Sequence, residues 1–240
     1  MISFVIPAHD EERSIALALA SVHAAARALG EPYEVIVVDD ASTDRTAEVA
    51  LAAGARVVPV AHRQISRTRN AGARAARGER LVFVDADTLV GAPLMVDAMR
   101  ALDRGAVGGG AMVRFDGPLP IHAHPVLAVL DLVMRWGGLA AGCFVFCTRA
   151  AFENVGGFDE SLYAGEELAI SVALKRQGRF VILGMRVVTS GRKLRSHSMA
   201  EMTSFLGRLA KDGVRTLQTR EGLEVWYGPR REDPEDAKAA

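Results

Sequence analysis

The sequence contains little cysteine and no excess of charge of either sign, and each shortage excludes a class of protein. Its two cysteines, Cys143 and Cys147, are spaced C-x3-C within an apolar segment. This spacing matches neither a redox C-x-x-C motif nor a zinc site with a second pair elsewhere, so we expect reduced, buried thiols in a cytoplasmic protein. Lys plus Arg number 29 and Asp plus Glu number 29. No global charge therefore favours a nucleic-acid partner.

Long uncharged apolar runs are also absent. The N-terminal apolar run ends at Pro7 with no basic stretch before it, which is unlike a signal peptide. Segment 125–149 is mostly apolar, but Asp131, Arg135 and a glycine pair interrupt it. A membrane-spanning helix needs about 20 apolar residues with few or no charges. We therefore expect no transmembrane segment, but a helix, a glycine break and a buried strand. Peripheral contact with the inner face of the membrane, through the apolar side, is left open.

Half of the 240 residues are hydrophobic, enough for one large α/β domain or two small ones. Over the first ninety residues, short apolar runs alternate with longer helical patterns. Strands are expected at 2–7, 33–40, 55–60 and 80–85, and helices at 12–30, 42–54 and 65–78. Ser42 or Thr43 is the expected N-cap of the second helix. This alternation predicts an α/β fold, in which helices flank a Rossmann-like, mostly parallel sheet.

Acidic side chains gather where three of the predicted strands end. They are Asp10 and Glu11 after the first strand, Asp39 and Asp40 at the end of the second, and Asp85 and Asp87 after the fourth. In a parallel sheet these ends meet at one edge, where ligands bind. The carboxylates would repel one another there unless a cation lay among them, and hard divalent cations prefer carboxylate oxygens. With Arg63, Arg67 and Arg69 nearby for anionic oxygens, the pattern describes a nucleoside diphosphate site.

Each acidic pair also has a purely structural interpretation. Asp39 and Asp40 could cap the following helix, and Asp85 and Asp87 could form a turn at the end of a strand. Glu166 and Glu167 could be ordinary first-turn acids that complement a helix dipole.

Several segments resemble, in order and spacing, the motifs of family 2 glycosyltransferases. They are VIPAHDEERSIALALASV, EVIVVDDASTDRT, SRTRNAGARAARGERLVFVDADT, FENVGGFDE and GEELAISVALKRQG. The resemblance covers residues 2–190 and implies the GT-A fold and inversion of the anomeric centre. No linker or repeat divides the chain. We therefore expect one GT-A domain over residues 1–225, with a nucleotide-binding half (1–90), an acceptor half (91–225) and a polar tail (226–240).

The resemblance implies a nucleotide pocket at the ends of the first two strands. Asp39 matches the aspartate that hydrogen-bonds the nucleotide base, and Pro7, His9 and Glu11 match residues that line the same pocket. Relatives often carry an aromatic residue and Asn where this sequence has His9 and Asp10, so Asp10 adds a charge.

The resemblance also implies a metal site and a basic contact. Asp85 and Asp87 match the D-x-D motif, the first toward the ribose and the second on Mn²⁺ or Mg²⁺, with the metal clamping the diphosphate leaving group. Arg69, or Arg63 or Arg67 in its place, matches a basic contact to the base or diphosphate.

An inverting transfer needs a base for the proton of the acceptor hydroxyl. The family offers a Glu-Asp pair at the start of a helix, and this sequence has Glu166-Glu167, so Glu167 is the expected base and Glu166 the alternative. Segment 187–198 matches a loop that closes over the diphosphate. There Arg192, with Lys193 and Arg195, could bind phosphates or form a solvated face, whereas His197 is more easily explained as an exposed histidine than as a metal ligand.

The sequence thus favours a metal-dependent glycosyltransferase that moves a sugar from a nucleoside diphosphate to a hydroxyl acceptor, either a glycan or a lipid-linked molecule. A sugar nucleotidyltransferase is disfavoured, because the stretch PAHDEE after the first strand is acidic and contains no glycine. A non-catalytic relative that binds a nucleotide sugar stays open, because Glu167 replaces the usual aspartate.

Overall fold

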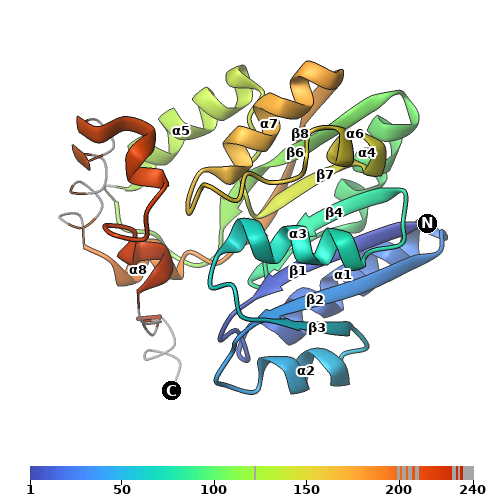
Figure 1. The fold of residues 1–240 in the computed structure, drawn as a ribbon, viewed down its shortest axis with the longest axis horizontal. Coiled ribbons are helices and arrows are strands. Elements are labelled where there is room, and N and C mark those ends of the chain that lie inside the picture. The colour runs from blue at the N-terminus through green and yellow to red at the C-terminus, as the bar shows by residue number, and fades with distance from the viewer. Residues whose placement is uncertain are drawn as a thin grey trace.

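The computed structural model describes residues 1–121, 123–198, 201, 204, 207, 208, 211–228, 231, 233 and 234. In this part of the chain, eight strands form one sheet with helices on both faces (Figure 1). The strands are β1 (Ile2–Ala8), β2 (Tyr33–Asp40), β3 (Arg56–Val60), β4 (Arg80–Val84), β5 (Thr88–Leu89), β6 (Ala106–Phe115), β7 (Phe144–Thr148) and β8 (Arg179–Thr189). The helices are α1 (Ile15–Leu29), α2 (Thr46–Ala52), α3 (Ile65–Ala75), α4 (Ala92–Asp103), α5 (Ala123–Gly137), α6 (Arg149–Asn154), α7 (Glu166–Gln177), α8 (Arg192–Ser196) and α10 (Glu224–Tyr227), with a 3-10 helix, η1 (Gly213–Leu217).

The strand order is β3-β2-β1-β4-β7-β6-β8-β5. The first four strands along the chain pair in parallel, as the alternation of strands and helices predicts. β7 runs antiparallel to both β4 and β6, and β6 and β8 are parallel. The predicted α/β fold is therefore confirmed. Its parallel half brings the carboxyl ends of β1, β2 and β4 to one edge, on the left in Figure 1.

The core has two layers, one on each face of the sheet. Because successive strand residues point to opposite faces, Phe4 and Ile6 pack with α1 and α4, whereas Val5 packs with α3, α6 and α7. All three side chains are fully buried. Both free cysteines are also buried, one in each layer, as the sequence predicts.

Segment 125–149 forms the predicted elements. It contains most of α5, then Gly138 in the left-handed conformation at φ 59°, then β7. Among the described residues, no helix combines the length and the apolar character that a bilayer crossing requires.

The predicted N-cap of the second helix was wrong. α2 begins at Thr46, whose backbone N–H donates to Asp44 Oδ1 over 2.9 Å. Ser42 and Thr43 instead bind the turn after β1, because the backbone N–H of Asp10 donates to Ser42 and that of Thr43 donates to the Asp10 carboxylate. These hydrogen bonds join the turn after β1 to the turn after β2.

α3 lies unusually close to the sheet because it contains a glycine at the contact. A Cβ atom on Gly72 would lie 2.3 Å from Val5 Cγ1 and 2.8 Å from Val38 Cγ2. Both valines are fully buried, so neither can move aside freely. The close approach sets how far the side chains on the buried face of α3 reach past the end of the sheet.

We predict that Gly72→Ala destabilises the fold. Overpacking of this kind costs about 1–3 kcal/mol, and alanine's better helix propensity recovers at most about 1 kcal/mol. Urea unfolding should therefore show a net loss of stability. Gly184→Ala on β8 is the control, since a Cβ there meets nothing within 4 Å. Equal midpoints for the two variants would show that α3 can shift without cost.

Candidate active site

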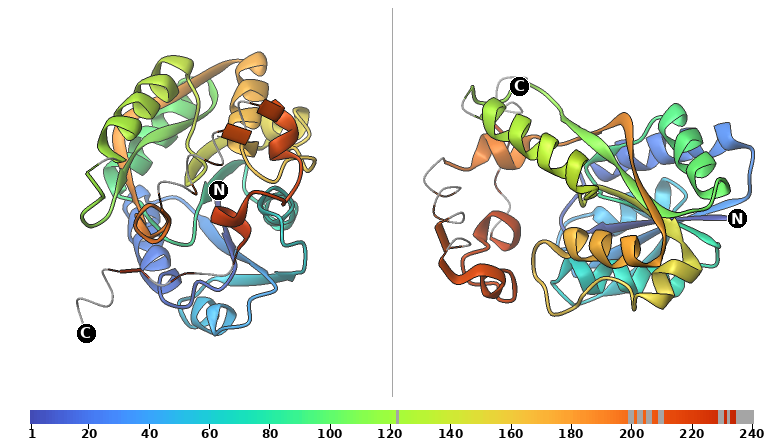
Figure 2. Two further views of the ribbon diagram at one scale, coloured as in Figure 1. Left: turned by 90° about the vertical axis from the view of Figure 1, so that its left-hand side faces the viewer. Right: turned by 90° about the horizontal axis from the view of Figure 1, so that it is seen from above.

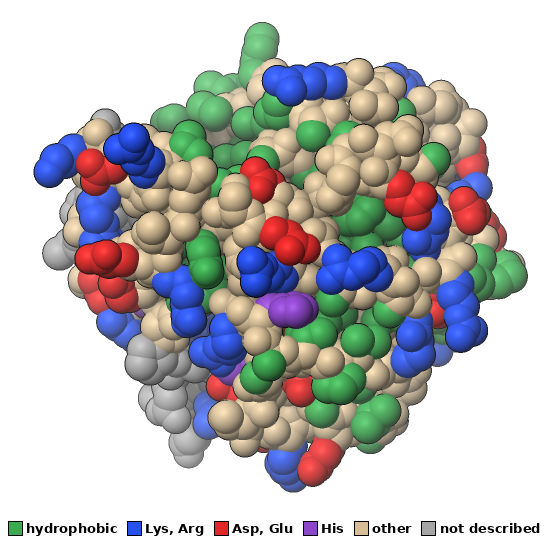
Figure 3. Space-filling model, in the orientation of Figure 1, with side chains coloured by type: hydrophobic (Ala, Val, Ile, Leu, Met, Phe, Trp, Pro, Cys, Tyr) green, Lys and Arg blue, Asp and Glu red, His purple; other side chains and the backbone are tan. Residues whose placement is uncertain are grey.

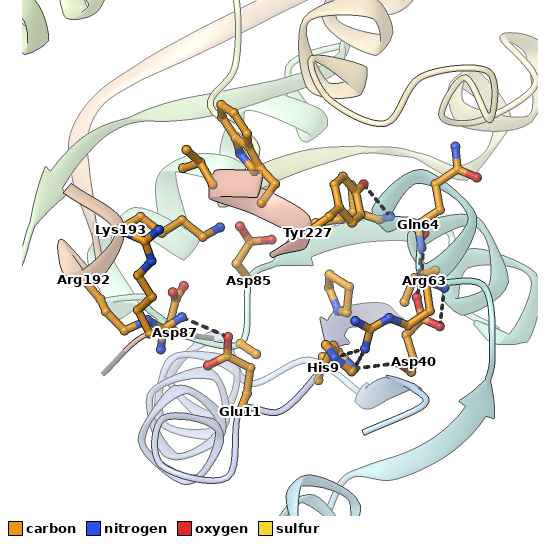
Figure 4. Close-up of a pocket in the computed structure, with 18 of the residues that line it drawn as sticks. His9, Glu11, Asp40, Arg63, Gln64, Asp85, Asp87, Arg192, Lys193 and Tyr227 are labelled. Carbon is orange, nitrogen blue, oxygen red and sulfur yellow. Dashed lines mark hydrogen bonds and ion pairs between the residues drawn. The ribbon is translucent and has the colours of Figure 1, made fainter. Parts of the chain in front are cut away.

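A cleft opens at the carboxyl edge of the parallel strands (Figure 4). Its walls come from the ends of β1, β2 and β4, from the start of α3, and from α8 and α10. The space between them is about 1040 Å³ with its open mouth included.

Asp40 holds the loop that forms one side of the cleft. Its carboxylate accepts hydrogen bonds from the backbone N–H groups of His62 and Arg63, at 2.7 and 2.8 Å, and from Thr68 Oγ1 at 2.7 Å. Arg63 adopts a left-handed backbone at φ 49°, which is uncommon for a residue with a side chain. The buried Asp40 carboxylate stabilises this conformation and so directs Arg63 into the cleft.

Pro7, His9 and Glu11 all line the cleft. His9 Nδ1 lies 2.8 Å from the Asp40 carbonyl oxygen, and the Arg63 guanidinium lies against its ring. Of the three arginines considered from the sequence, Arg63 lines the cleft, whereas Arg67 and Arg69 do not.

Asp39 is not among the residues that line the cleft. Its Oδ1 atom is buried and has no hydrogen-bond partner within the described ranges. An acceptor without a donor is costly to bury, so a ligand N–H would complete this site. The role of Asp39 toward the base stays a prediction.

Three carboxylates, those of Glu11, Asp85 and Asp87, surround the other side of the cleft. Burial, and then the charges of Glu11 and Asp85, raise the pKa of Asp87 to about 6, although Lys193 and Arg192 oppose this. Arg192 Nη2 lies 3.5 Å from Glu11 Oε1. Three carboxylates therefore face two basic side chains, so the negative charge of the site is not fully neutralised.

Asp85 and Asp87 fit a divalent metal site whose remaining ligands come from a substrate. No three His, Cys, Asp or Glu side chains in the described part of the chain are placed to share one metal. Mg²⁺ is usually bound by one or two carboxylates together with substrate phosphates, rather than by a cage made only of protein. Asp85 and Asp87 supply hard oxygen donors, and a cation beside them would offset the repulsion among the carboxylates.

Arg69 lies beneath the cleft and joins its two sides. The side chain is 1% exposed. Its Nη2 donates to Asp85 Oδ1 and to the Gly142 carbonyl, both over 2.8 Å, and its Nη1 donates to Glu166 Oε1 over 2.5 Å. Although burial opposes it, the neighbouring carboxylates raise the pKa of Arg69 above its usual range. Arg69 is thus a buried counter-charge, in contact with carboxylates and not among the cleft residues.

The acidic pair lies at the start of α7, as the sequence predicts. Gly165 precedes it in the left-handed conformation at φ 76°, which turns the chain into the helix. Burial raises the pKa of Glu166, opposed by Arg69. Burial, and then the charge of Glu166, raise the pKa of Glu167 to about 8. The two glutamates therefore differ, because Glu166 forms an ion pair with Arg69, whereas the pKa of Glu167 is raised to about 8.

The basic residues of α8 divide between two roles. Arg192, Lys193 and His197 line the cleft. Arg195 does not, because its guanidinium pairs with Asp116 at 2.9 Å and with Asp233 at 2.5 Å. The expectation that Arg195 could bind phosphates was therefore wrong.

Two aromatic residues of the cleft were missed from the sequence. Trp226 and Tyr227 in α10 line it, although they fall in the segment expected to be a polar tail; positions 229, 230, 232 and 235–240 of that segment lie outside the described residues. The Tyr227 hydroxyl donates to the Tyr163 carbonyl over 2.7 Å. Adjacent aromatics in an otherwise polar segment were the available signal.

We predict that Arg69→Met lowers the free energy of unfolding by about 3–5 kcal/mol, because it leaves the buried Asp85 and Glu166 carboxylates without their counter-charge. Urea unfolding measures the loss. Arg74→Met on the same helix is the control: its side chain is 64% exposed and lies 3.7 Å from Glu160, so its loss should stay below about 1 kcal/mol. If Arg69→Met unfolds like the control, the cluster does not hold the site together.

The chain is similar to known sugar transferases in sequence. Residues 3–155, more than half of the chain, match the sequence model of glycosyl transferase family 2. An undecaprenyl-phosphate 4-deoxy-4-formamido-L-arabinose transferase of Pseudomonas paraeruginosa is 36% identical over 94 residues, which cover 36% of this chain and 28% of that protein. A protein of the same name from Shewanella sediminis is 28% identical over 161 residues, 64% of this chain and 49% of that protein. The chain thus spans about half or less of the length of these relatives.

Solved structures share the fold. The mannosyltransferase PcManGT of Pyrobaculum calidifontis, in complex with GDP-Man and Mn²⁺, matches all of this chain and 75% of its own, with a TM-score of 0.67 at 18% identity. Glucosyl-3-phosphoglycerate synthase of Mycobacterium tuberculosis, in complex with Mn²⁺, UDP and glucosyl-3-phosphoglycerate, matches 97% of this chain and 81% of its own, with a TM-score of 0.62 at 22% identity. The predicted fold, that of the GT-A glycosyltransferases, is therefore confirmed.

Proposed function

This chain belongs to glycosyl transferase family 2, and from that premise we propose that it moves a sugar from a nucleoside diphosphate to an acceptor hydroxyl, with a divalent ion and inversion at the anomeric carbon. The observation that carries the proposal is the charge arrangement of the cleft. Asp85 and Asp87 lie near Arg192 and Lys193 of α8 (Figure 4). A diphosphate bound between them would meet a cation on one side and basic side chains on the other.

The residues in and around the cleft have distinct tasks in this proposal. Asp39 accepts a hydrogen bond from the base, and Asp85 and Asp87 would hold Mn²⁺ or Mg²⁺. Such an ion, when bound, stabilises the charge that develops on the departing diphosphate. Arg192 and Lys193 contact the phosphate oxygens.

Glu167 is the residue that we assign as the base. The acceptor oxygen attacks the anomeric carbon opposite the leaving group, the bond to the diphosphate breaks with its electron pair, and Glu167 takes the hydroxyl proton. Glu166 is less suited, because Arg69 Nη1 donates to it over 2.5 Å and it is only 4% exposed. Its task is instead to keep Arg69 in place.

The names of the relatives favour a second candidate for the acceptor. They name undecaprenyl phosphate, a lipid-linked molecule whose reactive group would be a phosphate oxygen. A phosphate monoester has lost most of its second proton at neutral pH, since that pKa is about 6. Transfer to such an acceptor would need no base, so dependence on Glu167 distinguishes a hydroxyl acceptor from a phosphate.

We predict metal-dependent stabilisation by one nucleoside diphosphate. A thermal-shift panel of UDP, GDP and dTDP, with and without Mn²⁺, should show one nucleotide that raises the melting temperature only with metal. At about 100 times its dissociation constant, a ligand stabilises the fold by about 2.7 kcal/mol, a shift of about 5–10 °C. Asp87→Ala should abolish the shift, and Asp97→Ala, exposed on α4, should keep it. A nucleotide that binds equally well to Asp87→Ala would contradict the metal site.

We also predict that Glu167→Gln lowers turnover to a hydroxyl acceptor by about 10²–10⁴-fold while donor binding is kept. Wild-type kcat at saturating donor should rise with pH until the base is ionised. Because a bound cation favours the ionised carboxylate, the midpoint should lie at or below the free protein's value of about 8. Release of the nucleoside diphosphate measures both, with Glu153→Gln as control.

Two results would redirect the proposal. Full turnover by Glu167→Gln would exclude Glu167 as the base and favour a phosphate acceptor. Donor binding without release of the diphosphate, whatever the acceptor, would favour the non-catalytic alternative.

A further inference from the structure

α5 presents its hydrophobic side chains to water. Val126, Val129, Leu130, Val133 and Trp136 are between 49% and 84% exposed. They recur at the spacing of one helix face and so form a continuous stripe, here called the apolar stripe of α5. A surface helix normally turns such a stripe toward the core, so α5 has the opposite orientation.

The opposite orientation is held by contacts on the other side of the helix. Ala123 is the one residue of α5 that is buried, and Asp131 Oδ2 accepts from Arg186 Nη1 of β8 over 2.9 Å. At the end of the helix, Lys175 of α7 donates to the Gly137 carbonyl. These contacts fix which face is outward, and no described element lies in front of α5 when the molecule is seen from above (Figure 2, right).

The apolar stripe forms a patch large enough to require an explanation. In the space-filling view, hydrophobic side chains gather along the upper left edge, over α5 (Figure 3). Singly exposed hydrophobic residues are common on proteins, but a contiguous patch marks a surface that binds something apolar. Trp136 is 84% exposed, and tryptophan is the side chain most typical of the boundary between lipid and water.

The charges beside the stripe decide between partners. Arg135 is an exposed cation in the last turn of α5, and Lys175 and Arg176 lie in the last turn of α7. The acid of α5, Asp131, is paired with Arg186. The stripe is thus bordered by cations at the end where it meets α7. An apolar helix face with cations beside it has the pattern of an interfacial helix on an anionic membrane.

We propose that the apolar stripe of α5 docks on an anionic lipid bilayer, with Arg135, Lys175 and Arg176 against the lipid phosphates. The helix lies in the plane of the membrane surface, since it is too short and too charged to cross it. The inference rests on the surface of α5 and is independent of the proposed transfer reaction, which uses a different face of the molecule.

Cosedimentation of the full chain with vesicles tests the proposal. Binding is expected to vesicles of phosphatidylcholine and phosphatidylglycerol in a ratio of about two to one, and should weaken with salt. Leu130→Glu should weaken it about tenfold or more, because a charge replaces an apolar group that enters the lipid. Leu51→Glu is the matched control: it is the same substitution at an exposed leucine, 59% against 49%, on a helix distant in sequence. Circular dichroism is the check that both variants are folded.

Trp136 supplies a second measurement that needs no change in the stripe. The chain has two tryptophans, so Trp226→Phe leaves Trp136 as the sole reporter. Its emission should shift to the blue with the mixed vesicles and be quenched by brominated acyl chains. Unchanged emission, or equal vesicle binding by the Leu130 and Leu51 variants, would overturn the proposal. So would a concentration-dependent dimer that Leu130→Glu dissociates while vesicles stay unbound, since a second copy would then cover the stripe.

Discussion

The buried guanidinium of Arg69 is the interaction on which the rest of the site depends. A charge cannot stay in the interior without partners, and here the partners come from distant parts of the chain, Asp85 at the end of β4 and Glu166 at the start of α7. One side chain therefore holds the end of β4 against the start of α7. Gly72, one turn further along α3, lets the same helix lie close on the sheet.

The same cluster sets the protonation of the groups around it. One arginine among several carboxylates leaves an excess of negative charge, and burial strengthens the repulsion. Burial is the largest cause that raises the pKa values of Asp87 and Glu167, to about 6 and about 8, and the neighbouring carboxylates add to it. Among the described residues, the non-glycine positions with positive φ, Asp10, Ala41 and Arg63, directly follow or lie shortly after β1, β2 and β3. Backbone strain is therefore concentrated in the loops after the parallel strands.

The sequence was sufficient where a feature depends on local pattern. The bounds of β2 agree with those predicted, because a run of apolar residues marks the strand. The glutamate pair begins a helix, as predicted, and a glycine directly precedes it. The sequence was insufficient where a side chain chooses among distant partners. Thr43 binds Asp10, 33 positions away, instead of capping α2, and Arg195 turns to Asp233 instead of the cleft. Nothing local marks such partners, and for the same reason Trp226 and Tyr227 were missed as cleft residues.

α5 shows a further limit of pattern, and its physical consequence. An apolar stripe at helical spacing predicts a helix, but not whether the stripe faces the core or the solvent. In this fold the narrow face around Ala123 and Asp131 is turned inward, so the half-exposed stripe contributes little to the stability of the free chain. Each large side chain left exposed forgoes about 1.5–3 kcal/mol of burial, which is available only when something apolar covers it. The stability of the fold therefore depends on the two core layers and the Arg69 cluster, whereas the apolar surface proposed for docking lies on α5. That separation allows the surface to change its partner without any change in the site.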